Sequence, residues 1–166
     1  MSLQDNPQQP KKATIVVFAG SLDKVMAAFI IATTAAAMGI ETTMFFTFWG
    51  LTALKKGGPG ECKRNWMQKM LALMLPRRAD SLPLSQLNMG GMGSAMLKKI
   101  MAQKNFSSLP ELIEAAQDLE VRMIACQMSM DAMGFCKEEL IEGVQIAGAA
   151  TYVGEARDGQ INLFIG

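Results

Sequence analysis

Cys126 lies where the pattern of neighbouring residues could turn a thiol into a nucleophile. Residues 121–126 have the pattern of a buried strand, and residues 127–134 have that of a short helix. Open α/β sheets place ligands at the carboxyl ends of their strands, and the free N–H groups of a following helix favour thiolate over thiol. The alternative is a cysteine that only packs, since free cysteines are among the most buried residues. Position alone leaves both interpretations open.

Two further side chains near Cys126 could assist it. Ser129, in the first turn of the predicted helix, could hydrogen-bond the sulfur or cap the helix, whereas Asp131 is interpreted as mainly structural. Cys136 follows Gly134 and Phe135. It could resolve an oxidised or persulfidated Cys126 if the loop brings the two sulfurs together, and packing is its alternative role.

The chain contains three cysteines and no histidine. An odd, low number of cysteines without framework spacing predicts reduced thiols in a cytoplasmic setting. Cys62 lies in a polar segment beside two cations, which could make it reactive, and a mobile, exposed thiol is the alternative. The missing histidine excludes Ser-His-Asp and Cys-His catalysis and histidine zinc sites. Any thiolate here must be activated by backbone dipoles, Lys or Arg.

Two glycine-containing turns could line a pocket for a small sulfur anion. Gly20 and Ser21 follow the first predicted strand and open a helix, a place suited to an anion. Gly90, Gly91 and Gly93 form a flexible turn with exposed N–H groups. Neither turn has the spacing of a P-loop or a dinucleotide-binding turn, and simple turn and capping chemistry is the alternative for both.

Methionines are numerous, with 15 in the chain, and many fall within residues 89–96 and 123–133. Thioethers can bind Cu(I), but no tight cluster stands apart from the packing pattern. We therefore predict packing in the core or between subunits. Neither a metal nor an organic cofactor is expected.

The elements that must position these residues alternate between strand and helix. Strands are predicted at 13–18, 41–48, 121–126, 144–147 and 160–165. Helices are predicted at 25–38, 64–75, 92–103, 109–119 and 127–134. A short helical turn is predicted at 49–54, a short helix at 137–142, and a helical turn or loop at 149–156. This order predicts a three-layer α/β/α sandwich with a mainly parallel five-stranded sheet.

Length and composition indicate one domain. Residues 1–11 are predicted to be a flexible tail and residues 12–166 a single α/β domain, in which 57–108 form a helical insertion or elaborated crossover. Half of the 166 residues are hydrophobic, and the net charge of +1 argues against a broad nucleic-acid-binding face. The longest uncharged stretch, 25–40, is shorter than a membrane-spanning helix, so a soluble cytoplasmic protein is predicted, with membrane association left open.

Three segments together resemble the DsrE/DsrF/DsrH-like superfamily. They are the run from Ala13 to Lys24, the turn from Met89 to Gly93, and the motif from Ala125 to Met130. The last two are similar to the DsrE-like branch that is also labelled peroxiredoxin-like, although the chain has no Thr-x-x-Cys site. The resemblance implies an α/β/α homo-oligomer that relays sulfane sulfur as a cysteine persulfide. The resemblance implies that Cys126 is the cysteine that holds the persulfide, and that the partners are rhodanese-like and TusA-like proteins.

Three functions remain as hypotheses. In the leading one, the protein is a sulfurtransferase or sulfur carrier, and Cys126 accepts sulfane sulfur and passes it to an acceptor thiol. In the second, the protein is a non-catalytic oligomeric scaffold that docks partners through the glycine–methionine turn and the region of Trp49 and Trp66. In the third, it is a thiol peroxidase or disulfide-exchange protein in which Cys136 resolves Cys126.

Overall fold

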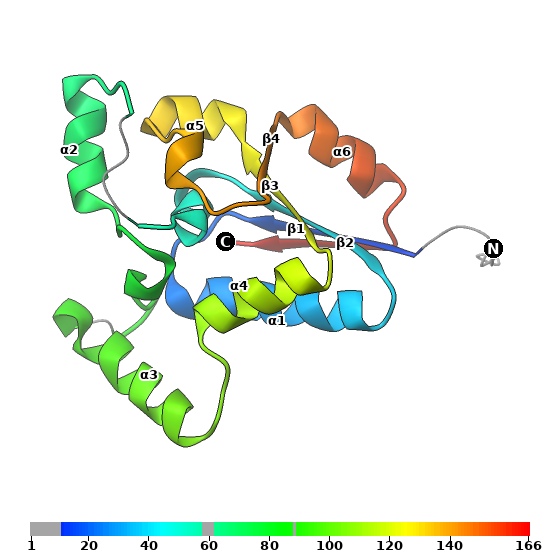
Figure 1. Cartoon of the computed structure of the whole chain (residues 1–166), viewed down its shortest axis with the longest axis horizontal. Coiled ribbons are helices and arrows are strands. Elements are labelled where there is room, and N and C mark those ends of the chain that lie inside the picture. Colours follow the sequence, from blue (N-terminus) through cyan, green and yellow to red (C-terminus); the bar gives the residue numbers. More distant parts are fainter. Residues whose placement is uncertain (1–10, 58–61, 88) are drawn as a thin grey trace.

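The computed structural model describes residues 11–57, 62–87 and 89–166, and five strands form its central sheet (Figure 1). The strands are β1 (Lys12–Val17), β2 (Glu41–Phe46), β3 (Arg122–Cys126), β4 (Gln145–Ala147) and β5 (Ile161–Ile165). Their order across the sheet is β4-β3-β2-β1-β5, and every neighbouring pair is parallel. The predicted parallel five-stranded sheet is confirmed.

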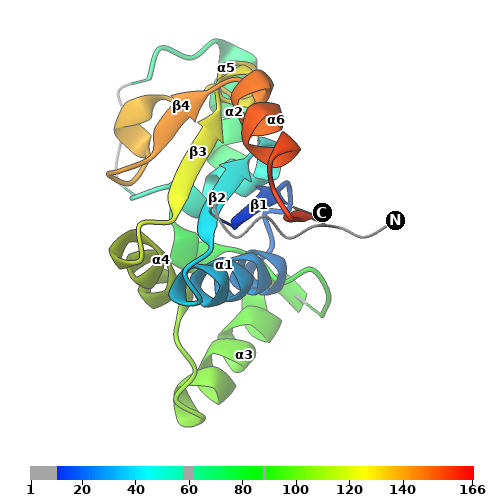
Figure 2. The same ribbon diagram turned by 90° about the vertical axis from the view of Figure 1, so that its right-hand side faces the viewer.

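Helices cover both faces of this sheet (Figures 1 and 2). On one face lie α1 (Leu22–Ala37) and α4 (Leu109–Asp118), and on the other lies α6 (Ala149–Arg157). The core between the sheet and α1 is the larger, and Phe29 and Phe46 are fully buried in it with ring centres 5.8 Å apart. The predicted three-layer sandwich is therefore confirmed.

Strands β1 and β2 are buried on both faces because every residue after their charged first one is apolar or β-branched. Five of the six residues of β1 and five of the six of β2 are buried. Such runs are typical of parallel strands covered by helices on either side. The outer strands β4 and β5 are short and contain no buried residue, which fits their position at the two edges.

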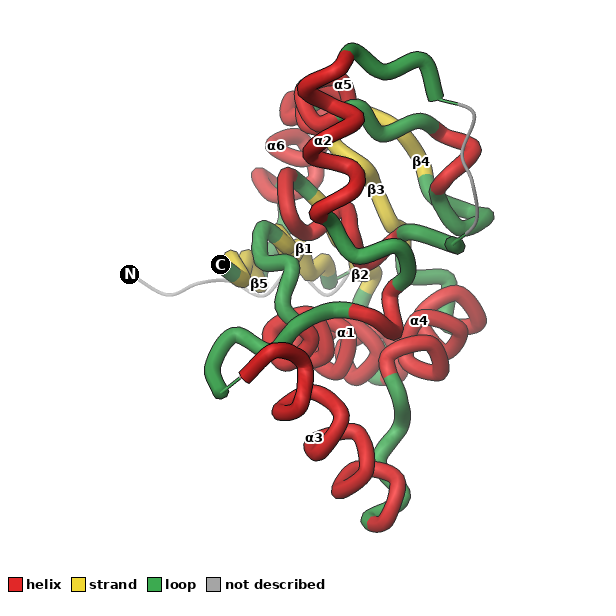
Figure 3. The backbone as a smooth tube through the Cα atoms, turned by 90° about the vertical axis from the view of Figure 1, so that its left-hand side faces the viewer, coloured by secondary structure: helices red, strands yellow, loops and turns green. Residues whose placement is uncertain are grey.

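Short helices gather at the end of the sheet to which the strands point. They are η1 (Phe48–Leu54), α5 (Gln127–Met133) and η4 (Lys137–Glu139). The insertion adds α2 (Trp66–Met74), η2 (Ala79–Ser81), η3 (Met89–Gly91) and α3 (Met92–Gln103) beyond them, with α2 and α3 on opposite sides of the sheet plane (Figures 1 and 3). The end of the sheet to which the strands point therefore carries most of the elements that lie outside the alternation of strand and helix.

The methionines divide between the core and the surface. Met123, Met130 and Met133 are buried, as the packing prediction requires. Met92 and Met96, on α3, are 71% and 63% exposed. Leu71 of α2 and Met101 of α3 pack against the core only as partly buried residues, and the insertion also presents uncovered hydrophobic side chains.

Predicted and observed element bounds agree within a few residues. Strand β2 ends at Phe46, two residues early, because the chain turns into η1 at Phe48, where φ is +46°. The segment predicted as a helical turn or loop at 149–156 is the full helix α6. The predicted tail, residues 1–11, lies outside the described residues except for Lys11.

Glu155 of α6 ties this helix to two strands at the amino-terminal side of the sheet. Its carboxylate accepts a hydrogen bond from Arg122 at 2.6 Å and another from Lys12 at 3.1 Å. These bonds, Arg122 first, hold the pKa of Glu155 below its ordinary value of 4.5, although partial burial opposes them. The contribution to stability is therefore present above about pH 4.5 and is lost as the pH falls through the lowered folded-state pKa.

We expect Glu155→Gln to lower the free energy of unfolding by about 1 kcal/mol at pH 7, because the pair is only partly shielded from solvent. The difference from the parent protein should shrink toward zero in acid, where the parent carboxylate is protonated. Urea unfolding at pH 7 and pH 3 measures both effects. Glu114→Gln, at an exposed position of α4, is the matched control. A deficit that is equal at the two pH values would contradict this account of Glu155.

Candidate functional site

Cys126 is the last residue of β3 and occupies the N-cap position of α5. Its backbone pairs with Ala147 of β4, and its side chain is 7% exposed. The thiol belongs to a small apolar cluster with Val16, Phe45 and Ile124, on the sheet face that α6 covers. Cys126 is thus placed at the carboxyl end of a strand, as predicted, but it is buried.

Tyr152 of α6 packs against this small cluster. Its ring lies 5.2 Å, centre to centre, from the ring of Phe45. Ala147, which pairs with Cys126, also packs against this cluster and lies two residues before the start of α6. We therefore expect a reagent to reach the buried thiol only when the contact of α6 with this cluster opens.

We expect Tyr152→Ala to raise the rate at which a small alkylating reagent modifies Cys126 severalfold, because the substitution removes the ring that covers the cluster. Intact-mass spectrometry over a time course measures the rate. Val153→Ala changes an exposed neighbour on the same helix and should leave the rate unchanged. Equal rates in the parent protein and Tyr152→Ala would show that access does not depend on this contact.

Ser129 contacts a different residue from the one predicted. Ser129 is 2% exposed, and its hydroxyl lies 2.7 Å from the hydroxyl of Thr47, which follows β2. This hydrogen bond joins the first turn of α5 to the carboxyl end of the neighbouring strand. Thr47 was not singled out from the sequence, because only the pairing of β2 with β3 brings it here. Asp131 is exposed, and its carbonyl accepts a 2.9 Å hydrogen bond from Gln68 of α2.

Gly20 and Ser21 line a cavity of about 230 Å³, with Trp49 and Leu75 among its other walls. The strand order reverses between β1 and β5, and Gly20 follows β1 at that reversal. Ligands of open sheets favour this point. Cys126, however, lies on β3, with β2 between it and β1, and is not part of this cavity.

Gly90, Gly91 and Gly93 lie at the start of the insertion helix α3. Gly90 and Gly91 have φ angles of +69° and +98°, which only glycine adopts without strain, and Gly91 is the N-cap of α3. A larger cavity of about 690 Å³ lies between α3, α1 and α4, with Met26 and Met101 among its walls. None of the three glycines lines either cavity, so the structure does not bring them together with Gly20, Ser21 or Cys126.

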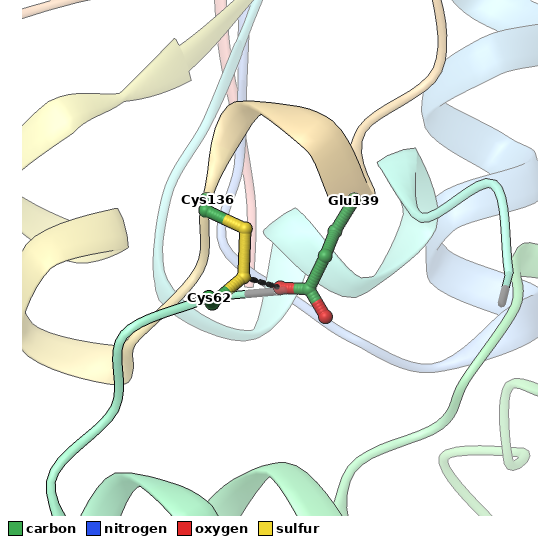
Figure 4. A group of neighbouring side chains, drawn as sticks. All are labelled: Cys62, Cys136 and Glu139. Atoms are coloured by element: carbon green, nitrogen blue, oxygen red, sulfur yellow. Dashed lines mark hydrogen bonds between the residues drawn. A yellow bond between two sulfur atoms is a disulfide. The ribbon is translucent and has the colours of Figure 1, made fainter. Parts of the chain in front are cut away.

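Cys62 and Cys136 form a disulfide, with Cα atoms 5.7 Å apart (Figure 4). The expectation of three reduced thiols is therefore wrong for this pair, and Cys126 is the free cysteine. Cys136 is bonded to Cys62 rather than placed to resolve Cys126. The two partners are 74 residues apart in the sequence, and they meet because the start of the insertion runs beside the loop that follows α5. Spacing alone could not show this.

Charged side chains surround the disulfide. Arg64 forms an ion pair with Glu139, whose side chain is 6% exposed, and also donates a 2.7 Å hydrogen bond to the carbonyl of Gly134. Lys55 is 8% exposed and lies 5.2 Å from the ring centre of Phe135. Burial lowers the pKa of Lys55, and the nearby Glu139 carboxylate partly offsets that effect. The Glu139 carboxylate, which contacts Cys62, thus has two cations near it, Arg64 and Lys55.

A profile described as the DsrE/DsrF/DrsH-like family matches residues 9–164, nearly the whole chain. The chain belongs to this family. The predicted resemblance is therefore confirmed, and the five-stranded fold described above is that of a family member.

Two curated relatives match over their full length. The uncharacterized protein YrkE of Bacillus subtilis (strain 168) is 46% identical over 158 residues, which cover 95% of this chain and 99% of YrkE. The sulfur carrier protein DsrE2 of Allochromatium vinosum is 41% identical over 169 residues, with the same coverage of 95% and 99%.

A solved structure shares the fold. The YchN protein from E. coli superposes with a TM-score of 0.56 at 12% identity, covering 94% of this chain and 99% of YchN. This similarity concerns the fold alone. Across residues 11–57, 62–87 and 89–166, no helix combines the length and the apolar character needed to cross a membrane.

Proposed function

We propose that the protein is a sulfur carrier that holds sulfane sulfur as a persulfide on Cys126. Membership of the DsrE/DsrF/DrsH-like family and the 41% identity to a sulfur carrier support a general role in sulfur relay. The observation that supports Cys126 as the carrier residue is that it is the free cysteine, at the carboxyl end of a central strand.

The proposed transfer has two balanced steps. The Cys126 thiolate attacks the outer sulfur of a donor persulfide, forms Cys126–S–SH and releases the donor as a thiolate. An acceptor thiolate then attacks the outer sulfur of Cys126–S–SH and leaves Cys126 as a thiolate. Neither step consumes an oxidant or a reductant, and neither requires a metal or an organic cofactor.

The partners follow from the same chemistry. Donors and acceptors must be thiols or persulfides, and rhodanese-like and TusA-like proteins are the proposed classes. We also propose that the chain acts in the cytoplasm and forms homo-oligomers, which would cover exposed apolar side chains such as Trp66, Leu73 and Met74 of α2.

The structure weakens the peroxidase alternative. A peroxidase that uses Cys126 and Cys136 needs the second thiol to resolve the first, and Cys136 is already bonded to Cys62. Ser129 is placed to join α5 to Thr47, so we propose that it positions the turn after Cys126 and does not touch the sulfur.

Mapping the site of sulfane sulfur tests the proposal directly. The protein is incubated with inorganic polysulfide, its thiols and persulfides are blocked with an alkylating reagent, and its peptides are analysed by mass spectrometry. We expect the persulfide adduct on the peptide that contains Cys126. Sulfur found only on other peptides would overturn the assignment of Cys126 as the carrier.

A further inference from the structure

We propose that Cys62 and Cys136 form a second sulfur site, a dithiol that reduces sulfane sulfur to hydrogen sulfide and closes to the observed disulfide. This inference rests on the proposed function in one respect, that sulfane sulfur is the cargo of the protein. It concerns residues other than Cys126 and a different reaction, because the sulfur is released rather than passed on.

The observed disulfide between Cys62 and Cys136 is the oxidised product that this reaction would form. The two sulfurs are bonded, and both cysteines are half-buried, so a small persulfide can approach them without opening the core. Cys62 lies at the start of the insertion, whereas Cys136 is the N-cap residue of η4. The disulfide therefore joins two surface segments, and its reduction separates no layer of the sheet.

Glu139 gives the pair an acid–base partner. One oxygen of its carboxylate lies 3.2 Å from the sulfur of Cys62, the contact drawn in Figure 4. A disulfide sulfur carries no proton, so this contact becomes a hydrogen bond only when Cys62 is a thiol. In that state the thiol donates to the carboxylate, which can accept its proton. Cys62 is therefore the attacking thiol, and Cys136 is the resolving one.

The cations hold the carboxylate in place and favour negative sulfur. Arg64 pairs with Glu139 and also donates to the carbonyl of Gly134, and this pairing holds the carboxylate beside Cys62. Lys55, buried beside Phe135, adds a second positive charge to the same cluster. An ionised Glu139 carboxylate opposes a thiolate on Cys62, and the positive charges of Arg64 and Lys55 offset that effect.

The reaction balances in two steps. The thiolate of Cys62 attacks the outer sulfur of a persulfide R–S–SH, forms Cys62–S–SH and releases RS⁻, while Glu139 takes the thiol proton. Cys136 loses its thiol proton to solvent, and its thiolate then attacks the Cys62 sulfur of Cys62–S–SH, forms the disulfide and expels HS⁻. The sulfane sulfur is reduced to sulfide, and the two thiols are oxidised to one disulfide. A further turnover needs an external dithiol reductant.

A divalent cation is the competing occupant of this cluster. The sulfurs of Cys62 and Cys136 and a carboxylate oxygen of Glu139 all lie within 4.8 Å of one another, as three ligands of a metal would. However, Arg64 already pairs with the carboxylate and Lys55 lies in the same cluster. Two fixed positive charges oppose a cation and favour an anionic sulfur species, so we infer sulfur chemistry.

The test uses the fully reduced chain carrying Cys126→Ser, so that the proposed carrier cannot contribute. Glutathione persulfide is added after the reductant is removed, free sulfide is trapped with monobromobimane, and the intact mass is recorded. We expect one sulfide above the protein-free control for each chain, with the loss of two hydrogens from the protein. Sulfide at the level of the control would overturn the proposal.

Two variants separate the steps, both with Cys126→Ser in the background. Cys136→Ser should stop after the first step, gain the mass of one sulfur on Cys62 and release no sulfide. Cys62→Ser should neither gain sulfur there nor release sulfide. Sulfide release by Cys136→Ser at the full rate would overturn the assignment, as would stoichiometric zinc uptake by the reduced chain that Cys62→Ser abolishes.

Glu139→Gln tests the proton acceptor. We expect sulfide release to slow by about tenfold near neutral pH and to recover as the pH rises, since hydroxide then replaces the carboxylate. Lys55 and Arg64 face this group, and Lys137 and Glu138 flank it on η4. A deficit that stays constant with pH would show that Glu139 only supports the structure.

The two proposals fail separately. Uptake of polysulfide sulfur by Cys126 in the parent protein tests the carrier role, whereas sulfide release in the Cys126→Ser background does not depend on it. Uptake without sulfide release would overturn only the second site. Sulfide release without uptake at Cys126 would overturn only the carrier role.

Discussion

Replacing Cys126 by alanine or serine is expected to abolish sulfur transfer through the protein while leaving its fold in place. The proposed carrier sulfur is bonded directly to this side chain, so no other group can replace it. We expect transfer from a persulfide donor to an acceptor thiol to fall by more than about a hundredfold, as for removal of other nucleophiles. Mass spectrometry of the acceptor measures the sulfur that it receives.

The two substitutions should differ in stability because Cys126 is 7% exposed in an apolar cluster. Cys126→Ala removes one buried atom and should cost about 1 kcal/mol of unfolding free energy. Cys126→Ser buries a hydroxyl among apolar neighbours and should cost about 1–3 kcal/mol. If both lose transfer equally, the loss follows from the missing sulfur. Transfer near the parent level in either variant would rule out Cys126 as the carrier.

The matched control removes the other two thiols. The double variant Cys62→Ser, Cys136→Ser lacks the disulfide but keeps Cys126, so its transfer to an acceptor should continue. Without the disulfide, the hydrogen bond between Arg64 and Gly134 still holds the segment before α2 to the end of α5. A double variant that transfers no sulfur would mean that the carrier role depends on the disulfide region.

Most of the sheet could be predicted from the sequence because its signals are local. Unbroken β-branched and aromatic runs mark β1 and β2, and Gly39 ends α1 where a positive φ of +77° requires glycine. No local signal shows that β5 lies beside β1, because the crossover through α6 carries the chain from one edge of the sheet to the other. As a result the strand order reverses between β1 and β5, and β1 lies two strands away from β3, which carries Cys126.

The candidate site could be predicted only in part, because only some of its features follow from neighbouring residues in the sequence. The strand and the helix that flank Cys126 are neighbours in sequence, so its position at a strand end could be predicted, whereas its burial under α6 depends on a distant segment. The disulfide joins residues 74 apart, which no spacing rule links. One signal was present: Cys62 is followed by two cations, and Cys136 is followed after Lys137 by two acidic residues. Opposite charges beside two cysteines can indicate that the segments meet.

Replacing Gly50 by alanine is expected to cause the largest loss of stability of any substitution considered. Gly50 is buried in η1, and its N–H lies 3.0 Å from the carbonyl oxygens of both Phe18 and Thr47. A Cβ at this position would lie 2.0 Å from the carbonyl oxygen of Val17 and 2.9 Å from its carbonyl carbon. Both atoms are backbone of the central strand β1, so no change of rotamer relieves the clash.

Either η1 or the end of β1 must then move, and η1 carries the buried Leu51 and Leu54. We expect Gly50→Ala to lower the free energy of unfolding by about 3–5 kcal/mol, a large part of the 5–15 kcal/mol that is usual for a domain. The midpoint of urea unfolding, followed by circular dichroism, measures this loss.

Gly154→Ala is the matched control, because it makes the same chemical change where there is room. Gly154 lies inside α6, and a Cβ there would meet no atom within 4 Å. Alanine favours the helix over glycine, so the variant should be more stable than the parent by about 0.5–1 kcal/mol. The two substitutions should therefore act in opposite directions. If Gly50→Ala has the same midpoint as the parent, then the backbone of η1 does not lie close enough to Val17 to place a Cβ 2.0 Å from its carbonyl oxygen.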